Sequence, residues 1–186
     1  MRIISGTARG RKLASFDGIE VRPTPDRVRE ALFSLLTSRF GSLHGRTVLE
    51  LFAGTGAQSL EAISRGAATA VVVDQHPDAI ALIRDNTRRC GFGDAVTIIQ
   101  GTLPACLPLV RDAAPFDLIL MDPPYNSGLI EQLIEQIATL NLLKDSGIIC
   151  AETARGDVPQ YQGTIVHLQS RSYGSTGVHL FGYPKG

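Results

Sequence analysis

The chain has 186 residues, of which 44% are hydrophobic and 19% charged, and its formal net charge is zero. This length fits one α/β domain with a small extension, and the composition excludes an intrinsically disordered chain. The longest apolar runs have only the length of a strand, which excludes a membrane-spanning helix, and no apolar signal-peptide segment follows Met1. The sequence therefore predicts a cytoplasmic protein.

The charges are distributed unevenly along the chain. Residues 1–46 contain nine Lys and Arg against four Asp and Glu, a net of +5, so the remainder carries −5 because the total is zero. A basic N-terminal arm on an acidic body is typical of a protein with a polyanionic partner. A merely solvated basic face is the alternative.

The three cysteines are widely spaced and include no C-x-x-C pair, and no Cys/His cluster has the spacing of a metal site. We therefore expect buried free thiols at Cys90, Cys106 and Cys150, and no bound metal.

The N-terminal region is expected to form a basic arm followed by a helix. Its first 22 residues alternate short apolar pieces with glycine and basic residues, which is typical of a small β-hairpin or an extended arm. Thr24 and Pro25 suit the N-cap and the first helical position, so a helix is predicted from about Pro25 to Arg39. Arg27 and Arg29 lie outside its apolar stripe, where we expect them to be available to phosphate.

From Thr47 onward, strand patterns and helix patterns alternate. This order predicts a parallel sheet with helices on both faces, whose ligands bind at the carboxyl ends of the strands. Late in the chain, two more strand patterns around a glycine-bearing turn predict an antiparallel hairpin. The predicted strands span 48–52, 70–74, 96–99, 116–121 and 147–151, the hairpin strands 164–168 and 178–181, and the helices 59–65, 77–89, 104–110 and 129–139.

A glycine turn follows the first predicted strand. Gly54 and Gly56 would let a ligand approach the backbone at the start of the next helix, although a tight turn alone can require glycine for steric reasons. Asp74 ends the second strand 18 residues after Gly56, close to the offset at which a carboxylate binds ribose hydroxyls. Together these features indicate an adenosine-bearing ligand.

Two residues argue against NAD as that ligand. Ser59 occupies the place of the third glycine of the dinucleotide-binding fingerprint. Glu50 lies inside the first strand, where a buried carboxylate needs a cationic or amine-bearing partner. S-adenosylmethionine supplies such a cation through its ammonium and sulfonium groups, so we expect it as the cofactor.

The segment Asp122-Pro123-Pro124-Tyr125 directly follows the fourth predicted strand. Its two prolines disfavour both helix and sheet ladder, so the corner is rigid. The Asp122 carboxylate and the Pro123 carbonyl could accept hydrogen bonds from both N–H groups of an exocyclic amine and so draw its nitrogen toward tetrahedral geometry. Tyr125 could stack on the base that carries this amine. A simple strand-ending turn is the alternative.

These motifs together resemble the class I S-adenosylmethionine-dependent methyltransferases that act on exocyclic amino nitrogens. Further segments are similar to segments of the bacterial 16S rRNA guanine-N2 methyltransferases of the small ribosomal subunit. These segments are Arg2-Ile3-Ile4-Ser5-Gly6, Arg9-Gly10-Arg11-Lys12-Leu13, Arg22-Pro23-Thr24-Pro25-Asp26-Arg27-Val28-Arg29-Glu30 and Tyr173-Gly174-Ser175-Thr176. The resemblance covers almost the whole chain. It implies a Rossmann-like fold with a seven-stranded, mostly parallel sheet, and methyl transfer to N2 of a guanine in 16S rRNA.

The resemblance also implies a role for each motif. Residues 1–45 would form the RNA-binding extension and residues 46–186 the methyltransferase domain. The catalytic corner would consist of Asp122, Pro123, Pro124 and Tyr125. Cofactor contacts are expected from Glu50, Phe52, Gly54, Gly56, Asp74, Gln75, Thr102 and Leu103, with Thr102 where the family usually has an Asp or Asn facing the adenine. RNA contacts are expected from Arg9, Arg11, Lys12, Arg22, Thr24, Arg27 and Arg29.

Other classes of protein share part of this pattern. A DNA adenine-N6 or cytosine-N4 amino-methyltransferase would share the corner, but it normally carries a larger target-recognition region. A non-catalytic or NAD-type nucleotide-binding protein would share only the sheet. Methylation at carbon 5 of a pyrimidine needs a thiol, commonly in a Pro-Cys pair, which Cys106 lacks. The expected partner is 16S rRNA, alone or within the 30S subunit or its assembly intermediate, bound by a monomer without membrane contact.

Overall fold

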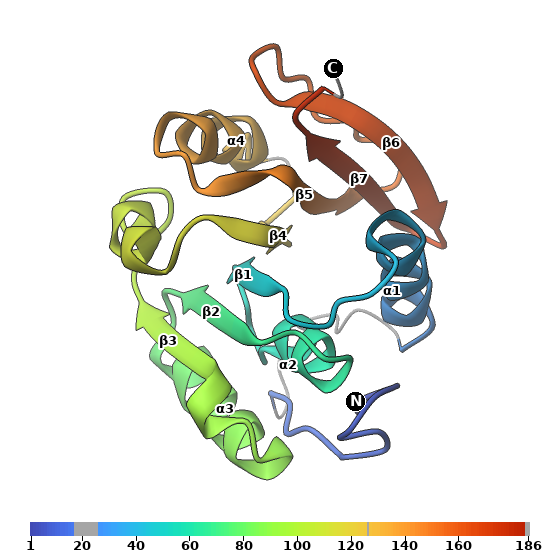
Figure 1. The fold of residues 1–186 in the computed structure, drawn as a ribbon, viewed down its shortest axis with the longest axis vertical. Helices are drawn as coiled ribbons and strands as arrows, with labels where there is room; N and C mark the ends of the chain where they lie inside the picture. Colours follow the sequence, from blue (N-terminus) through green and yellow to red (C-terminus); the bar gives the residue numbers. More distant parts are fainter. Residues whose placement is uncertain (17–25, 126, 185–186) are drawn as a thin grey trace.

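One seven-stranded sheet, in the order β3-β2-β1-β4-β5-β7-β6, organises the computed structural model, which describes residues 1–16, 26–125 and 127–184 (Figure 1). The first five strands are parallel, and β7 runs antiparallel to both β5 and β6. The predicted parallel sheet with a C-terminal antiparallel hairpin is therefore confirmed. The strands are β1 (Thr47–Leu51), β2 (Thr69–Asp74), β3 (Val96–Gln100), β4 (Phe116–Met121), β5 (Leu143–Ala154), β6 (Val166–Tyr173) and β7 (Thr176–Gly182).

Helices cover both faces of the sheet, because the central strands are apolar on both sides. The helices α1 (Asp26–Phe40), α2 (Ala57–Ser64) and α3 (Pro77–Cys90) pack on one face, around Val72 and Leu120. Helix α4 (Leu129–Thr139) and the 3₁₀ helix Leu107–Ala113 pack on the other face, around Ile119. This is the layered arrangement that the alternating pattern predicts.

The strand order reverses between β1 and β4. Leu51, at the end of β1, pairs with Val73 of β2 on one side and with Met121 of β4 on the other. In open α/β sheets, ligands bind beyond the carboxyl ends of the strands at such a reversal. The glycine turn after β1 and the Asp-Pro-Pro-Tyr corner after β4 both start at this edge.

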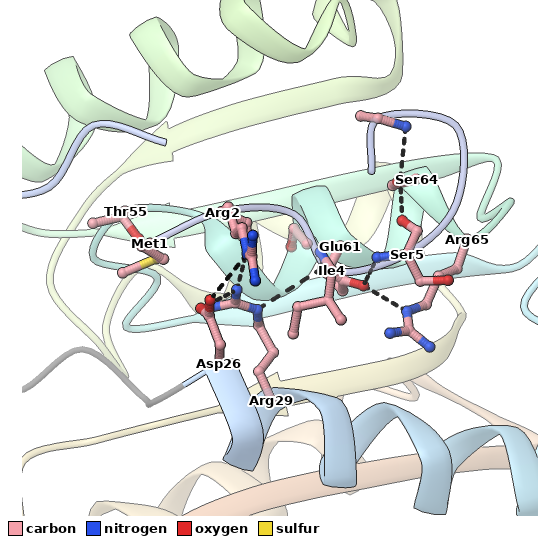
Figure 2. A network of polar contacts seen from close by, with 12 residues as sticks. Met1, Arg2, Ile4, Ser5, Asp26, Arg29, Thr55, Glu61, Ser64 and Arg65 are labelled. Atoms are coloured by element: carbon pink, nitrogen blue, oxygen red, sulfur yellow. Dashed lines mark hydrogen bonds and ion pairs between the residues drawn. The ribbon is translucent and has the colours of Figure 1, made fainter. Parts of the chain in front are cut away.

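The N-terminal arm folds back on itself and lies against α2. Arg2 and Lys12 form an antiparallel bridge, and Ile3 is fully buried. The backbone N–H groups of Ile4 and Ser5 donate to the Glu61 carboxylate at 2.7 and 3.0 Å (Figure 2). The hairpin-like arm is therefore confirmed over residues 1–16, whereas the predicted RNA contacts Arg22 and Thr24 lie outside the described residues.

Helix α1 belongs to the same core as the sheet. Its side chains Leu32, Phe33 and Leu36 pack in one cluster with Val48 of β1 and Val178 of β7. Packing alone thus marks no boundary at residue 45, and the division into an RNA-binding extension and a methyltransferase domain stays a prediction of function.

Three predicted elements differ clearly from the structure. The hairpin strand expected at 164–168 is found at Val166–Tyr173, so it continues up to the glycine-bearing turn. The short helix expected at residues 104–110 is a 3₁₀ helix over Leu107–Ala113, with Pro108 in its first turn. The strand expected at 147–151 extends over Leu143–Ala154, because a register shift against β4 lets Leu143 pair with Phe116 before the regular ladder begins at Ile148.

The three cysteines are buried free thiols, as predicted. Among the helices that the structure describes, none is long and apolar enough to cross a bilayer.

Candidate active site

A cavity of about 540 Å³ lies at the carboxyl ends of β1, β2 and β4. The turn after β1, the end of β2, the segment after β3 and the corner after β4 all contribute to its wall. Its lining residues are Phe16, Phe52, Gly54, Asp74, Gln75, His76, Asp78, Ala79, Gly101, Leu103, Asp122, Pro123, Pro124 and Tyr125. The cavity therefore brings the glycine turn, the β2 carboxylate and the Asp-Pro-Pro-Tyr corner to one site.

The turn after β1 uses left-handed backbone at three positions. Gly54 has φ +57° and Gly56, which begins α2, has φ +72°. Phe52 has φ +60°, a backbone conformation that is strained for an aromatic residue and that clusters at functional sites. A Cβ on Gly54 would meet nothing within 4 Å, so this glycine serves the backbone conformation and leaves open space beside it.

Asp74 holds that turn in place. One of its carboxylate oxygens accepts the Gly54 N–H at 2.8 Å, and the other accepts the His76 N–H at 2.9 Å. The side chain is 7% exposed and lines the cavity. Asp74 thus fixes the rim of the cavity and still has acceptor capacity for a ligand hydroxyl, because each carboxylate oxygen has two lone pairs.

Glu50 lies beneath the turn, buried among the strand ends. Its carboxylate accepts the Ser59 N–H at 2.9 Å at the start of α2. Burial raises the pKa of Glu50 to about 7; the hydrogen bonds from Ser59 and Gln58 oppose this shift, and the nearby Asp122 charge adds to it. Glu50 does not itself line the cavity as described.

Asp122 lies at the junction of cavity and corner. Burial raises the pKa of Asp122 to about 6. Within the described part of the chain, no ion pair joins Asp122 or Glu50 to a Lys or Arg side chain. Two neighbouring carboxyl groups with raised pKa values are stabilised by a ligand that carries positive charge.

A second, smaller cavity of about 180 Å³ lies on the other side of the corner. Pro123, Pro124 and Tyr125 line both cavities, so the corner is the wall between them. Tyr125 is 50% exposed, which leaves its ring accessible for stacking. A ligand in one cavity and a ligand in the other can thus come close to each other at this corner.

The chemistry of the first cavity fits S-adenosylmethionine. Asp122 in its lining, with the buried Glu50 carboxyl group close to it, suits a cationic ammonium and sulfonium, and the open space beside Gly54 suits close approach to the backbone. Asp74 suits a ribose diol, and the aromatic ring of Phe16 suits the face of an adenine.

The cavity contains most, but not all, of the predicted cofactor residues. Five of them line it, namely Phe52, Gly54, Asp74, Gln75 and Leu103. Glu50, Gly56 and Thr102 are not among the lining residues, whereas Gly101, the neighbour of Thr102, is one of them. Sequence reasoning missed Phe16, because nothing in an arm assigned to RNA indicates that it reaches a cavity at the strand ends.

The predicted RNA contacts fall into two groups. Arg9, Arg11, Lys12 and Arg27 are exposed, as a phosphate-binding surface requires. Arg29 is only 1% exposed, and its guanidinium contacts the Arg2 carbonyl, the Asp26 carboxylate at 3.0 Å and the Glu61 carboxylate at 3.9 Å (Figure 2). The expectation that Arg29 is available to phosphate is wrong, because this arginine fastens the arm and α1 to α2.

The sheet order and the cavity at its carboxyl edge define a class I, S-adenosylmethionine-dependent methyltransferase. A family model described as "Conserved hypothetical protein 95" matches residues 1–182, and the chain belongs to this family.

Individual relatives agree with this assignment. The chain is 31% identical over 183 residues to the "Putative rRNA methyltransferase YlbH" of Bacillus subtilis, covering 97% of this chain and 98% of that protein. It is 35% identical over 152 residues to the "Ribosomal RNA small subunit methyltransferase D" of Escherichia coli K12, covering 82% and 71%. The solved structure of yhhF from Escherichia coli is similar with a TM-score of 0.83 and 30% identity, covering 98% and 97% of the two chains.

Proposed function

We propose that this methyltransferase transfers a methyl group to the exocyclic N2 of a guanine in 16S rRNA of the small ribosomal subunit. The observation that carries the proposal is the shared wall between the two cavities, which Pro123, Pro124 and Tyr125 form beside Asp122. A cofactor in the larger cavity and a flipped base in the smaller one would meet at this corner.

The corner suits the chemistry of an aromatic amine. The lone pair of such a nitrogen is delocalised into the ring, so the amine is a poor nucleophile. The Asp122 carboxylate and the Pro123 carbonyl would accept hydrogen bonds from its two N–H groups. These hydrogen bonds would localise the lone pair and stabilise the positive charge that develops on nitrogen. S-adenosylmethionine would supply the methyl group, so that the nitrogen–carbon bond forms as the sulfur–carbon bond breaks.

The remaining roles concern the base and the released proton. Tyr125 would stack on the flipped base, an interaction worth about 1–3 kcal/mol. The nitrogen loses one proton after methyl transfer, and Asp122, whose pKa burial raises to about 6, is placed to receive it and pass it to solvent. Orientation of amine and methyl group across the corner would supply much of the remaining rate enhancement.

The RNA substrate is supported by the arm and by the relatives. Arg9, Arg11, Lys12 and Arg27 form an exposed basic set on the arm and the start of α1. The Escherichia coli relative is named as a methyltransferase of small-subunit ribosomal RNA. On this proposal the protein works in the cytoplasm as a monomer, on 16S rRNA or a particle that contains it.

Asp122→Ala and Asp122→Asn test the mechanism together. We expect Asp122→Ala to lower the rate of methyl transfer by at least about a hundredfold, as removal of one oriented acceptor does, and to leave the fold intact. Asp122→Asn keeps one acceptor oxygen and should retain more activity than the alanine variant. Wild-type rates in Asp122→Ala, with S-adenosylmethionine still bound in titration calorimetry, would show that the proposed mechanism is wrong.

A further inference from the structure

The smaller cavity beside the corner is acidic. Glu131, Glu152 and Asp157 line it, together with Thr153 and the corner residues. Phosphate groups are repelled by such a wall, whereas the N–H groups of a nucleobase edge are attracted to it. The cavity therefore suits the base of a nucleic acid and not its backbone.

Glu152 is the buried member of this acidic set. It is 3% exposed near the end of β5, and its carboxylate accepts a hydrogen bond from the Gln58 side chain of α2 at 2.5 Å. The ladder pairs Met121 with Ala151, so Glu152 is the next residue on β5 as Asp122 is the next residue after β4. Glu152 and Asp122 thus lie side by side at the same edge of the sheet.

The wall next to Glu152 is held by a series of hydrogen-bonded polar side chains that extends into the C-terminal hairpin. Thr153 Oγ1 lies 2.8 Å from the Asp157 carbonyl oxygen and 3.0 Å from His179 Nε2, and Ser170 Oγ lies 2.8 Å from His179 Nδ1. These hydrogen bonds fix the loop between Thr153 and Asp157, and they give the cavity a defined shape without its ligand.

We propose that Glu152 selects guanine by accepting the N1–H of the target base while the adjacent N2 amine lies against Asp122; this inference rests on the proposed function. Of the two ring nitrogens beside the N2 amine of guanine, N1 carries a hydrogen and is a donor. The one ring nitrogen beside the reactive amine is an acceptor in adenine, where N1 lies beside N6, and in cytosine, where N3 lies beside N4. A carboxylate at this place attracts guanine and repels the lone pair of the other two bases.

Glu152→Gln is the test variant, because it keeps the shape of the side chain and an acceptor for Gln58 while removing the charge. We expect methyl transfer to fall on the order of 10- to 100-fold, the size of one specific base interaction. The affinity for S-adenosylmethionine should stay unchanged, which also reports that the variant is folded. Glu135→Gln, an exposed glutamate on α4 outside the cavity, is the matched control and should keep the wild-type rate.

A chemical substitution in the RNA isolates the hydrogen bond from N1. 2-Aminopurine keeps the N2 amine but lacks the N1–H. With the wild-type protein, small subunits reconstituted with 2-aminopurine at the methylated position should therefore be methylated more slowly than small subunits with guanine there. In Glu152→Gln this preference for guanine should shrink at least about tenfold. An unchanged preference in Glu152→Gln, or a wild-type rate on guanine, overturns the inference.

Failure of the proposed function has a different signature. In that case, the wild-type protein itself forms no N2-methylguanosine on unmodified small subunits, and the selection of guanine by Glu152 is overturned with it.

Discussion

Arg29 and Glu61 form a buried ion pair between α1 and α2, with Nε and Oε2 3.9 Å apart and side chains 1% and 0% exposed (Figure 2). The same carboxylate accepts the backbone N–H groups of Ile4 and Ser5 and a hydrogen bond from Arg65 Nε at 2.7 Å. One buried glutamate thus joins the N-terminal arm and two helices. The Glu61 carboxylate is therefore one of the contacts that hold the arm against α2, together with the hydrogen bond from the Ala8 N–H to Ser64.

Arg29→Met should therefore be strongly destabilising. It removes one partner of a buried pair and leaves Glu61 without part of its compensation, which typically costs about 3–5 kcal/mol. Chemical denaturation measures the free energy of unfolding. Arg27→Met, at the exposed neighbouring position, should change it by less than about 0.5 kcal/mol. Equal effects of the two substitutions would show that the buried pair is not structural.

Glu50 should make the stability of the protein depend on pH. Its pKa is about 7 in the folded state and 4.5 ordinarily, so the folded state binds more protons in this window and its stability falls as pH rises from 4.5 through 7. At about 1.36 kcal/mol per pH unit, the cost above pH 7 is roughly 3 kcal/mol.

Glu50→Gln should remove this cost. The variant should be more stable than wild type at pH 8 without cofactor, nearly equal to it at pH 4.5, and weaker in binding S-adenosylmethionine. Denaturation at the two pH values and calorimetric titration measure these effects, with the exposed Glu30→Gln as control. A stability difference that is the same at both pH values would contradict a raised pKa for Glu50.

Phe16 should contribute to cofactor affinity. It is the one lining residue of the larger cavity that comes from the described part of the arm. We expect Phe16→Ala to weaken S-adenosylmethionine binding by about tenfold, because stacking on the adenine is worth about 1–3 kcal/mol. Leu109→Ala, 64% exposed and outside this cavity, should leave binding unchanged. An unchanged affinity of Phe16→Ala for S-adenosylmethionine would show that the arm does not contribute to the cofactor site.

The basic arm should set the salt dependence of RNA binding. Replacing Arg9, Arg11 and Lys12 by Glu should weaken binding, and the slope of log affinity against log salt should become shallower by about one for each phosphate that the variant no longer neutralises. Arg111→Glu, exposed on the 3₁₀ helix of the opposite face, is the control for charge alone. If the arm variant and this control have equal slopes, RNA binds on another surface.

Local patterns predict most of the fold. The apolar runs of β2 and β4, the proline at the start of α3 and the repeated order of strand and helix give the sheet and its layers. Asp74 and Asp122 could be placed at one edge from sequence because parallel strands end on the same side. The turn at Gly54 follows from the same reasoning.

Long-range packing accounts for what the sequence missed. Arg29 lies off the apolar stripe of α1, yet it is buried because the arm and Glu61 of α2 pack over it. The residue pattern of α1 alone does not indicate that other segments pack there. The place of Phe16 and the pairing of Gln58 with Glu152 arise in the same way, from segments far apart in the chain.

The most direct test of the central claim is nucleoside analysis after tritiated methyl transfer from S-adenosylmethionine to naked 16S rRNA and to 30S particles. The proposed function predicts N2-methylguanosine as the labelled nucleoside in at least one of the two, and its disappearance with Asp122→Ala. Label in N6-methyladenosine or N4-methylcytidine, or no transfer to either substrate, would contradict it.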